Sequence, residues 1–147
     1  MLKELFNKDL WEFYDKGNWI AITTNNVVKT NGEAVMGKGV ALEAANKFPT
    51  LAQELGRYLR LLGDNIPYIF PHFNLITFPT KHHYREDSSL ELIKSSTEFL
   101  IKWLKGHPEI KTIYMPRPGC GNGNLHWADV KALLEPSLDD RFIVVSL

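Results

Sequence analysis

Two glycine-rich loops, each between a predicted strand and a predicted helix, constrain the fold of this chain more than any other feature. The first contains MGKG at residues 36–39, follows an apolar strand expected at residues 19–24, and opens an alanine-rich helix. The second, RPGCGNGN at residues 117–124, follows another expected strand and also precedes a helix. In α/β sheets, ligands lie beyond the carboxyl ends of the strands, where helix N-termini offer unpaired N–H groups to anions.

The remaining segments continue this alternation of strands and helices. The clearest helix begins near Ser88, which has capping-box spacing with Glu91, and ends at Gly106. Its apolar stripe is Leu90, Ile93, Thr97, Ile101 and Leu104, and the helix before it has Leu51, Leu55, Leu59 and Leu62 on one face and stops at Gly63. The expected helices cover residues 40–48, 49–63, 88–106 and 126–136; the expected strands cover 19–24, 110–116 and 142–147, with two short ones within 68–79 that end at Pro71 and Pro79.

This order predicts a mixed sheet with helices on both faces, formed by one domain that spans residues 1–147. The 17 basic residues balance the 17 acidic ones, so no overall positive field is available for nonspecific binding of a polyanion. The single cysteine excludes an internal disulfide and a cysteine zinc cluster. No segment reaches the roughly 20 apolar residues of a membrane span, and we expect a soluble, cytoplasmic protein without membrane partners.

The first loop also matches the start of the P-loop pattern, from Gly32 to Lys38. That pattern continues with Ser or Thr, whose hydroxyl holds Mg²⁺, whereas this chain has Gly39. The expected strands also lack the terminal Asp that would hold the same ion. A nucleoside triphosphatase is therefore excluded, and the two loops together favour a clamp for the two phosphates of a diphosphate.

Four segments together make the chain resemble the macrodomain family, which binds ADP-ribose. They are AITTNN at residues 21–26, VMGKGVALEAANKFP at 35–49, ITFPTKHHYRE at 76–86, and MPRPGCGNGNLHWADVKALLE at 115–135. The GKGVA, FPTK and GCGNG motifs are similar to the branch that contains the DNA ADP-ribosyl glycohydrolase antitoxins and the terminal ADP-ribose protein glycohydrolase. The resemblance implies a three-layer α/β/α fold with a central mixed sheet.

The same resemblance implies which residues bind ADP-ribose. Asp9 matches the Asp that accepts from the adenine amino group, although Lys8 replaces the glycine that precedes it in the family. Asn25 and Asn26 are expected near the distal ribose, and Lys81, with Thr80 before it, aligns with the lysine held to be catalytic in this branch. The two phosphate loops are expected to consist of Met36, Gly37, Lys38, Gly39, Val40 and Ala41, and of Pro118, Gly119, Cys120, Gly121, Asn122, Gly123 and Asn124.

The chemistry of Lys81 leaves alternatives open. An unprotonated lysine amine can attack an opened sugar aldehyde as a Schiff base, and burial or nearby positive charge favours that form while phosphates oppose it. A lysine at a strand end can equally be solvated or pair with phosphate. The protein glycohydrolase pattern has an Asp where this chain has Gly123, so GCGNG matches the DNA-directed type.

Several other residues suggest sites that we weigh lower. His82 and His83 are adjacent on an extended segment and point to opposite faces, so a metal site is not expected. Cys120 fits a small buried side chain better than a nucleophile. The aromatic residues Trp11, Phe13, Tyr14 and Trp19 fit the core, whereas Tyr84 and Arg85 are candidates for the rim of the site.

The sequence thus predicts a protein that binds ADP-ribose and hydrolyses ADP-ribosyl linkages on DNA or protein, without metal or cofactor. One alternative is a noncatalytic ADP-ribose reader that uses the same pocket. Another is a phosphatase that acts on ADP-ribose 1″-phosphate.

Overall fold

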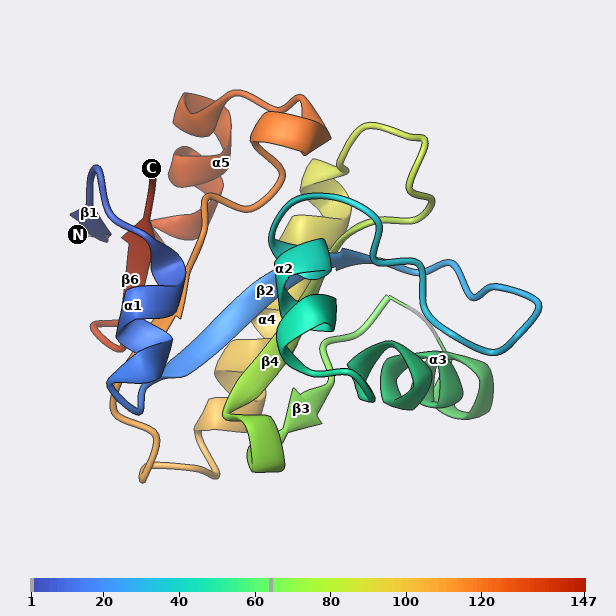
Figure 1. Cartoon of the computed structure of the whole chain (residues 1–147). Helices are drawn as coiled ribbons and strands as arrows, with labels where there is room; N and C mark the ends of the chain where they lie inside the picture. Colours follow the sequence, from blue (N-terminus) through green and yellow to red (C-terminus); the bar gives the residue numbers. More distant parts are fainter. Residues whose placement is uncertain (1, 64) are drawn as a thin grey trace.

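Six strands form one sheet at the centre of the computed structural model, which describes residues 2–63 and 65–147 (Figure 1). The strands are β1 (Lys3–Leu5), β2 (Trp19–Asn25), β3 (Ile69–Phe70), β4 (Leu75–Lys81), β5 (Ile113–Met115) and β6 (Phe142–Val145). The helices are α1 (Leu10–Asp15), α2 (Gly39–Lys47), α3 (Leu51–Leu62), α4 (Leu90–Leu104) and α5 (Trp127–Leu134), with 3₁₀ turns η1 (Pro71–Phe73) and η2 (Gly121–Gly123).

The sheet is mixed, with the strand order β1-β6-β5-β2-β4-β3. The pairs β1/β6, β5/β6, β2/β5 and β2/β4 are parallel, and only the short edge strand β3 is antiparallel to its neighbour β4. The carboxyl ends of β2, β4, β5 and β6 therefore meet at one edge of the sheet. This is the edge where the two glycine-rich loops begin.

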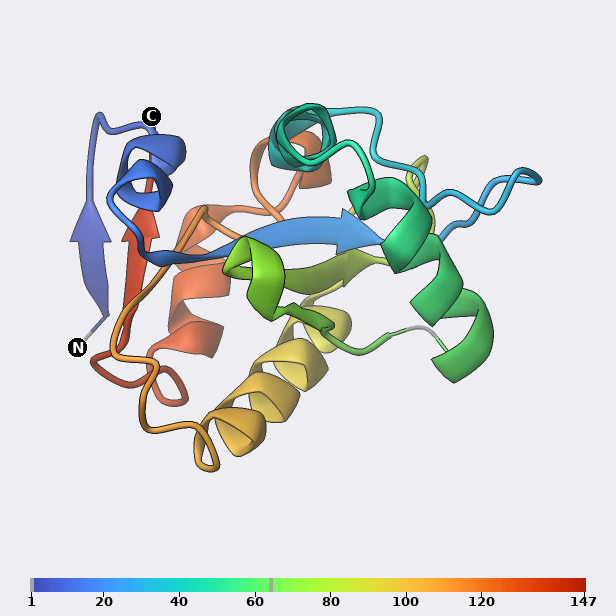
Figure 2. The ribbon, with the colours of Figure 1, turned by 60° about the horizontal axis from the view of Figure 1, so that its bottom comes forward.

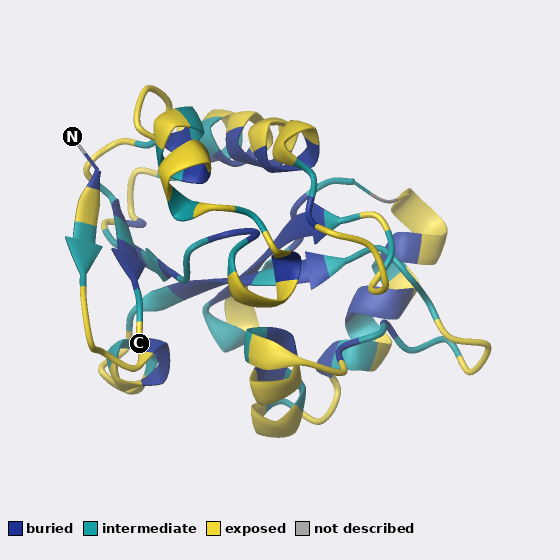
Figure 3. Cartoon of the chain, turned by 90° about the horizontal axis from the view of Figure 1, so that it is seen from above, coloured by how far each residue is buried: buried dark blue, intermediate teal, exposed yellow. Residues whose placement is uncertain are grey.

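Helices cover both faces of the sheet, as the sequence predicts. Helices α1, α2 and α3 share one buried cluster with the side chains of Ile20, Ile22 and Phe70, while α4 and α5 share a second with Phe78 and Phe142. Figure 2 shows the sheet between these two helical layers, and Figure 3 shows that the helices are buried toward the sheet and exposed on the outside. The fold is a three-layer α/β/α arrangement.

The start of the chain adds two elements that the sequence did not predict. Strand β1 pairs with the last strand, β6, and Asp9 caps α1 by accepting a hydrogen bond from the Trp11 amide at 3.0 Å. Trp11 is 5% exposed, and the ring of Phe13 stacks on Tyr114. The aromatic residues near the N-terminus, including Tyr14 and Trp19, pack against the two buried clusters, as predicted.

The boundaries of several predicted elements need correction; β5, for example, covers Ile113–Met115 instead of residues 110–116. Helix α4 (Leu90–Leu104) begins two residues after the start of the expected range 88–106, because Ser89, not Ser88, caps it by accepting from the Leu92 amide at 3.1 Å. Strand β4 runs through Pro79 to Lys81. Strand β3 pairs only with Leu75 and Ile76, so β4 has no partner on that side at Pro79 and the missing N–H costs no ladder bond there.

Leu90 and Leu62 also differ from the expected apolar faces. Leu90 is 41% exposed at the first turn of α4, and the buried face instead includes Leu92 and Leu100. Leu62 is the last residue of α3 and is 66% exposed. The other predicted leucines of α3 are buried, and Gly63 follows the helix with φ of 100°.

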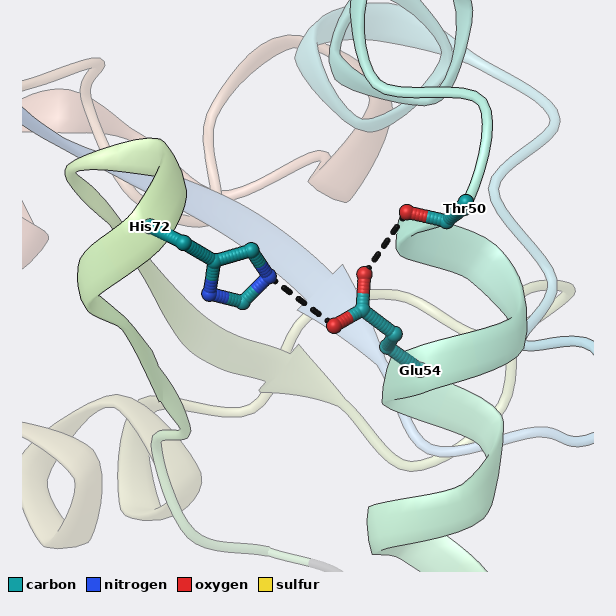
Figure 4. A network of polar contacts seen from close by, with 3 residues as sticks. All are labelled: Thr50, Glu54 and His72. Atoms are coloured by element: carbon teal, nitrogen blue, oxygen red, sulfur yellow. Dashed lines mark hydrogen bonds and ion pairs between the residues drawn. The ribbon is translucent and has the colours of Figure 1, made fainter.

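A small polar network connects α3 with the turn after β3 (Figure 4). Glu54 accepts a hydrogen bond from Thr50 Oγ1 at 2.7 Å and pairs with His72 Nε2 at 2.9 Å. The His72 side chain is half exposed, so solvent screening keeps the pair within the range of about 0–1 kcal/mol that is usual at a surface. The network orients η1 but does not hold the fold together.

Over residues 2–63 and 65–147, no helix is long and apolar enough to cross a membrane.

Gly56 of α3 provides a test of the packing between this helix and the loop before α2. A methyl group at Gly56 would overlap the carbonyl oxygen of Gly32 and lie 2.9 Å from the Ala34 nitrogen. Replacing Gly by Ala in a helix usually stabilises it by about 1 kcal/mol, but here the clash involves backbone that cannot turn away. We expect Gly56→Ala to lower the free energy of unfolding by about 1–3 kcal/mol in urea titrations. The exposed neighbour Gln53→Ala, as a control, should change it by less than about 0.5 kcal/mol, and equal stabilities of the two variants would contradict this packing.

Candidate functional site

A cleft with a volume of about 710 Å³ lies at the carboxyl edge of the sheet. This is within the range of about 300–1,000 Å³ that small-molecule sites usually have. Asn25 ends β2, Lys81 ends β4, Pro116 follows β5, and Val145 ends β6, so the four parallel strands deliver residues to one place. The starts of α1 and α2 and both glycine-rich loops complete the walls.

The first loop leads directly into the N-terminus of α2. Gly39, the first residue of this helix, has a backbone φ of 59°, which residues other than glycine rarely adopt. Lys38 stands at the cap position but makes no side-chain cap hydrogen bond, and the first turn contains no acidic residue. The N-terminus of α2 therefore presents its positive end and its backbone N–H groups to the cleft, which suits an anion.

The second loop is shaped by tight packing under its glycines. Gly119 has φ of 78°, and a methyl there would lie 2.7 Å from Ile93 Cδ1. Gly123 has no positive φ, but its carbonyl accepts from the Ser88 amide at 2.9 Å, and a methyl would overlap Ser88 Oγ. An Asp at position 123, as in the protein glycohydrolase pattern, has no room unless Ser88 moves.

Lys81 and both loops converge on Asn122. Lys81 Nζ donates a hydrogen bond to the Asn122 carbonyl oxygen at 2.9 Å, and a methyl on Gly39 would lie 3.0 Å from Asn122 Nδ2. The amine is thus held at the point where the two loops approach each other.

Charged side chains give the cleft a positive balance in an otherwise neutral chain. Four basic side chains line it, Lys8, Lys38, Lys81 and Arg117, against two acidic ones, Asp9 and Glu43. The guanidinium carbon of Arg117 lies 5.1 Å from the centroid of the Trp127 ring and 5.8 Å from that of Phe6. Arg117 Nη2 also lies 3.9 Å from Glu4 Oε1, so the three lysines supply most of the positive charge that suits a diphosphate.

The cleft brings together most of the residues that the sequence predicted for the site. They are Asp9, Asn25, Met36, Gly37, Lys38, Gly39, Val40, Ala41, Thr80, Lys81, Gly119, Cys120, Gly121, Asn122 and Gly123. Asn26, Pro118 and Asn124 do not line it. Asn26 Nδ2 donates to Asn65 Oδ1, Pro118 is buried beneath the loop, and Asn124 Nδ2 donates to Asp87 Oδ1.

Several residues that line the cleft were not predicted. They are Lys8, Leu10, Thr23, Thr24, Leu42, Glu43, Ser88, Pro116, Arg117, Val145 and Leu147, and Tyr84 joins them from the predicted rim. Three of these residues, Thr23, Thr24 and Val145, lie at the carboxyl ends of parallel strands. This position in the sequence could have identified them as site residues.

Cys120 and the two adjacent histidines each make contacts within the protein. Cys120 packs against the second buried cluster, and burial raises the pKa of its thiol more than nearby Arg117 lowers it, which disfavours the thiolate nucleophile. His82 Nδ1 lies 3.0 Å from Asn65 Oδ1, while His83 Nδ1 accepts from the Arg85 amide. Within the described ranges, no group of three His, Cys, Asp or Glu side chains could hold a metal ion.

Two known proteins with similar sequences share the same name. The chain is 30% identical over 136 residues to a DNA ADP-ribosyl glycohydrolase of Thermus aquaticus, covering 84% of this chain and 37% of the relative. It is also 30% identical over 131 residues to one of Mycobacterium tuberculosis, covering 82% and 37%. The chain thus spans little more than a third of the length of these curated relatives. No family model matches it.

Solved structures of macrodomains superpose on this chain. The macrodomain of Thermus aquaticus DarG superposes with a TM-score of 0.75 at 26% identity, over 99% of this chain and 97% of that one. The macrodomain of Mycobacterium tuberculosis DarG gives 0.77 at 24% identity, over 99% and 97%. Thermosipho africanus DarTG, solved in complex with ADP-ribose, gives 0.78 at 21% identity, over 100% and 42%. The chain is a macrodomain of the branch to which these DarG macrodomains belong.

Proposed function

We propose that this macrodomain binds ADP-ribose in the cleft between its two glycine-rich loops and removes it from DNA as an ADP-ribosyl glycohydrolase. The observation that carries this proposal is the position of Lys81, whose Nζ lies 2.9 Å from the Asn122 carbonyl oxygen where the two loops meet. The names of the related DNA ADP-ribosyl glycohydrolases support the substrate. The lack of room at Gly123 supports a DNA-directed site over one that uses an aspartate.

Each part of the ligand has a matching part of the cleft. The exposed backbone of Gly37, Lys38 and Gly39 at the start of α2, together with the loop at Gly121 and Asn122, would hold the two phosphates. Asp9 lies at the start of α1 with its carboxylate exposed, and it can accept from the amino group of adenine. The distal ribose then lies against Asn25 and Lys81.

Lys81 would act as a nucleophile on the distal ribose. Its unprotonated amine attacks the anomeric carbon, and the bond from this carbon to the base breaks. The leaving base takes up the proton that the amine loses. The sugar ring then opens to give a Schiff base with the lysine. Water hydrolyses the Schiff base, which regenerates the amine and releases ADP-ribose. The hydrogen bond to Asn122 orients the amine before the ligand binds.

The competing function is a noncatalytic ADP-ribose reader. One observation favours it, because a lysine that only fixes the second loop would make the same hydrogen bond to the Asn122 carbonyl. Both functions need ADP-ribose to bind, and only the hydrolase needs the amine.

Lys81→Ala distinguishes these functions. We expect the release of ADP-ribose from ADP-ribosylated single-stranded DNA to fall by about 10²-fold or more, because the group that attacks or assists the leaving base is lost. Affinity for free ADP-ribose should change much less, since the phosphates are held by backbone. ADP-ribosylated protein and ADP-ribose 1″-phosphate, assayed in parallel, identify the other substrate classes.

Lys94→Ala is the matched control, because Lys94 is exposed on α4 and does not line the cleft. Its turnover should equal that of the wild type. Turnover that survives in Lys81→Ala would contradict the role of the amine. Binding without turnover of any substrate by the wild type would leave the reader as the function.

Gly39→Ala tests the loop itself. An alanine at φ of 59° costs about 1–2 kcal/mol in that conformation, and its methyl would press on Asn122 Nδ2. We expect the loop to shift and the affinity for ADP-ribose, measured by calorimetry, to fall by about 5- to 30-fold. Gly17→Ala has a comparable φ of 91° and open space around it, away from the cleft. It should lose stability but retain affinity, and equal affinities of the two variants would argue against the loop as a phosphate site.

A further inference from the structure

The bend that follows Lys81, residues 82–86, lies at the mouth of the cleft. Tyr84 is the residue of this bend that lines the cleft. In Figure 1 the yellow-green segment after β4 lies on the opposite side of α2 from α1, and α1 carries the end proposed for adenine. A group attached to the distal ribose therefore leaves the cleft past this bend.

Hydrogen bonds fix the bend near both of its ends. His82 Nδ1 donates to Asn65 Oδ1 at 3.0 Å, and Asn65 also accepts from Asn26 Nδ2 at 2.6 Å. After the bend, Asp87 accepts from Asn124 Nδ2 at 2.8 Å, which ties it to the second loop. The bend is thus held in place before any substrate arrives, which lowers the entropic cost of binding.

Two side chains of the bend, those of His83 and Arg85, lie against the ring of Tyr84. The Tyr84 ring lies against the His83 ring with centroids 4.3 Å apart and an interplanar angle of 28°. The guanidinium carbon of Arg85 lies 5.6 Å from the Tyr84 centroid. Tyr84 remains 41% exposed, an uncommon exposure for an aromatic ring in this chain. The His83 ring and the Arg85 guanidinium both lie against the Tyr84 ring, and the exposed part of the ring is available to a further planar group.

We propose that Tyr84 stacks on the nucleobase that carries the ADP-ribose or on its neighbour in the strand, and that Arg85 contacts the adjoining phosphate. This inference rests on the proposed function, because it concerns the macromolecular end of the same substrate. An aromatic face accepts any base, and a single guanidinium suits a phosphate. Glu86 and Asp87 follow Arg85 directly and repel further phosphates. The footprint is therefore a short single-stranded segment of one or two nucleotides.

The test compares two affinities in each variant. In the Lys81→Ala background, which keeps the substrate intact, fluorescence anisotropy gives the affinity for an ADP-ribosylated single-stranded oligonucleotide relative to that for free ADP-ribose. We expect the oligonucleotide to bind more tightly, and Tyr84→Ala to reduce this ratio by about 5- to 150-fold, the usual effect of removing one base-stacking ring. Tyr84→Phe should keep the ratio, because the ring rather than the hydroxyl is needed.

Phe99→Ala is the matched control, since Phe99 is also an exposed aromatic residue, 38% accessible on α4, and does not line the cleft. It should keep the ratio. A ratio of one in the parent background, or the same ratio with and without the Tyr84 ring, would overturn the proposal. An ADP-ribosylated peptide that shows the same advantage and the same loss in Tyr84→Ala would assign the bend to protein targets instead.

Turnover of the oligonucleotide with Lys81 intact is measured separately. Its absence contradicts the proposed hydrolase, while the affinity ratio still decides the role of Tyr84.

Discussion

The approach of the two glycine-rich loops at Asn122 is the contact on which the site depends. One loop begins after β5 and the other leads into α2. The strands of the sheet do not join these two loops to each other. The Lys81 hydrogen bond to the Asn122 carbonyl joins the second loop to the end of β4, and Gly39 brings the first loop against the Asn122 side chain. The two loops, the end of β4 and Lys81 therefore meet at one edge of the sheet.

Packing beneath the loops explains why their glycines are needed at particular positions. Gly39 needs its positive φ, whereas Gly123 needs the absence of a side chain because Ser88 fills the space. Ser88 also donates its amide to the Gly123 carbonyl, so the segment before α4 supports the second loop. A change in the chemistry of this loop, such as an added aspartate, requires a change at Ser88 as well.

The sequence predicted the architecture well because the strands are short, apolar and separated by clear helical patterns. It missed β1 and α1, since three-residue strands and six-residue helices leave too little periodicity to detect. It placed the start of α4 at Ser88 because Ser88 has capping-box spacing with Glu91, but the adjacent Ser89 has the same capping chemistry and the backbone decides between them. It ended β4 at Pro79 because proline usually ends a strand, whereas here no strand pairs with Pro79 on the side away from β2, which is a property of the sheet.

For the site, the two loops could be predicted because their glycines and their place after strands are visible in the sequence, whereas Lys81 was predicted from the resemblance to the macrodomain branch. Arg117, Glu43 and Val145 could not be assigned, because their contribution depends on which strand ends and helix starts meet in space. Asn26 was predicted for the site, together with Asn25, from the macrodomain resemblance, but successive side chains of an extended segment point to opposite sides. Its amide instead helps to fix the bend at His82 through Asn65.

The most direct measurement is a titration of the ¹⁵N-labelled protein with ADP-ribose, followed by NMR. The account predicts saturable 1:1 binding, with the largest amide shifts in residues 37–41 and 119–123 and a smaller set at the start of α1. No saturable binding, or shifts confined to surfaces away from the carboxyl edge of the sheet, would contradict the assignment of the cleft as the ADP-ribose site.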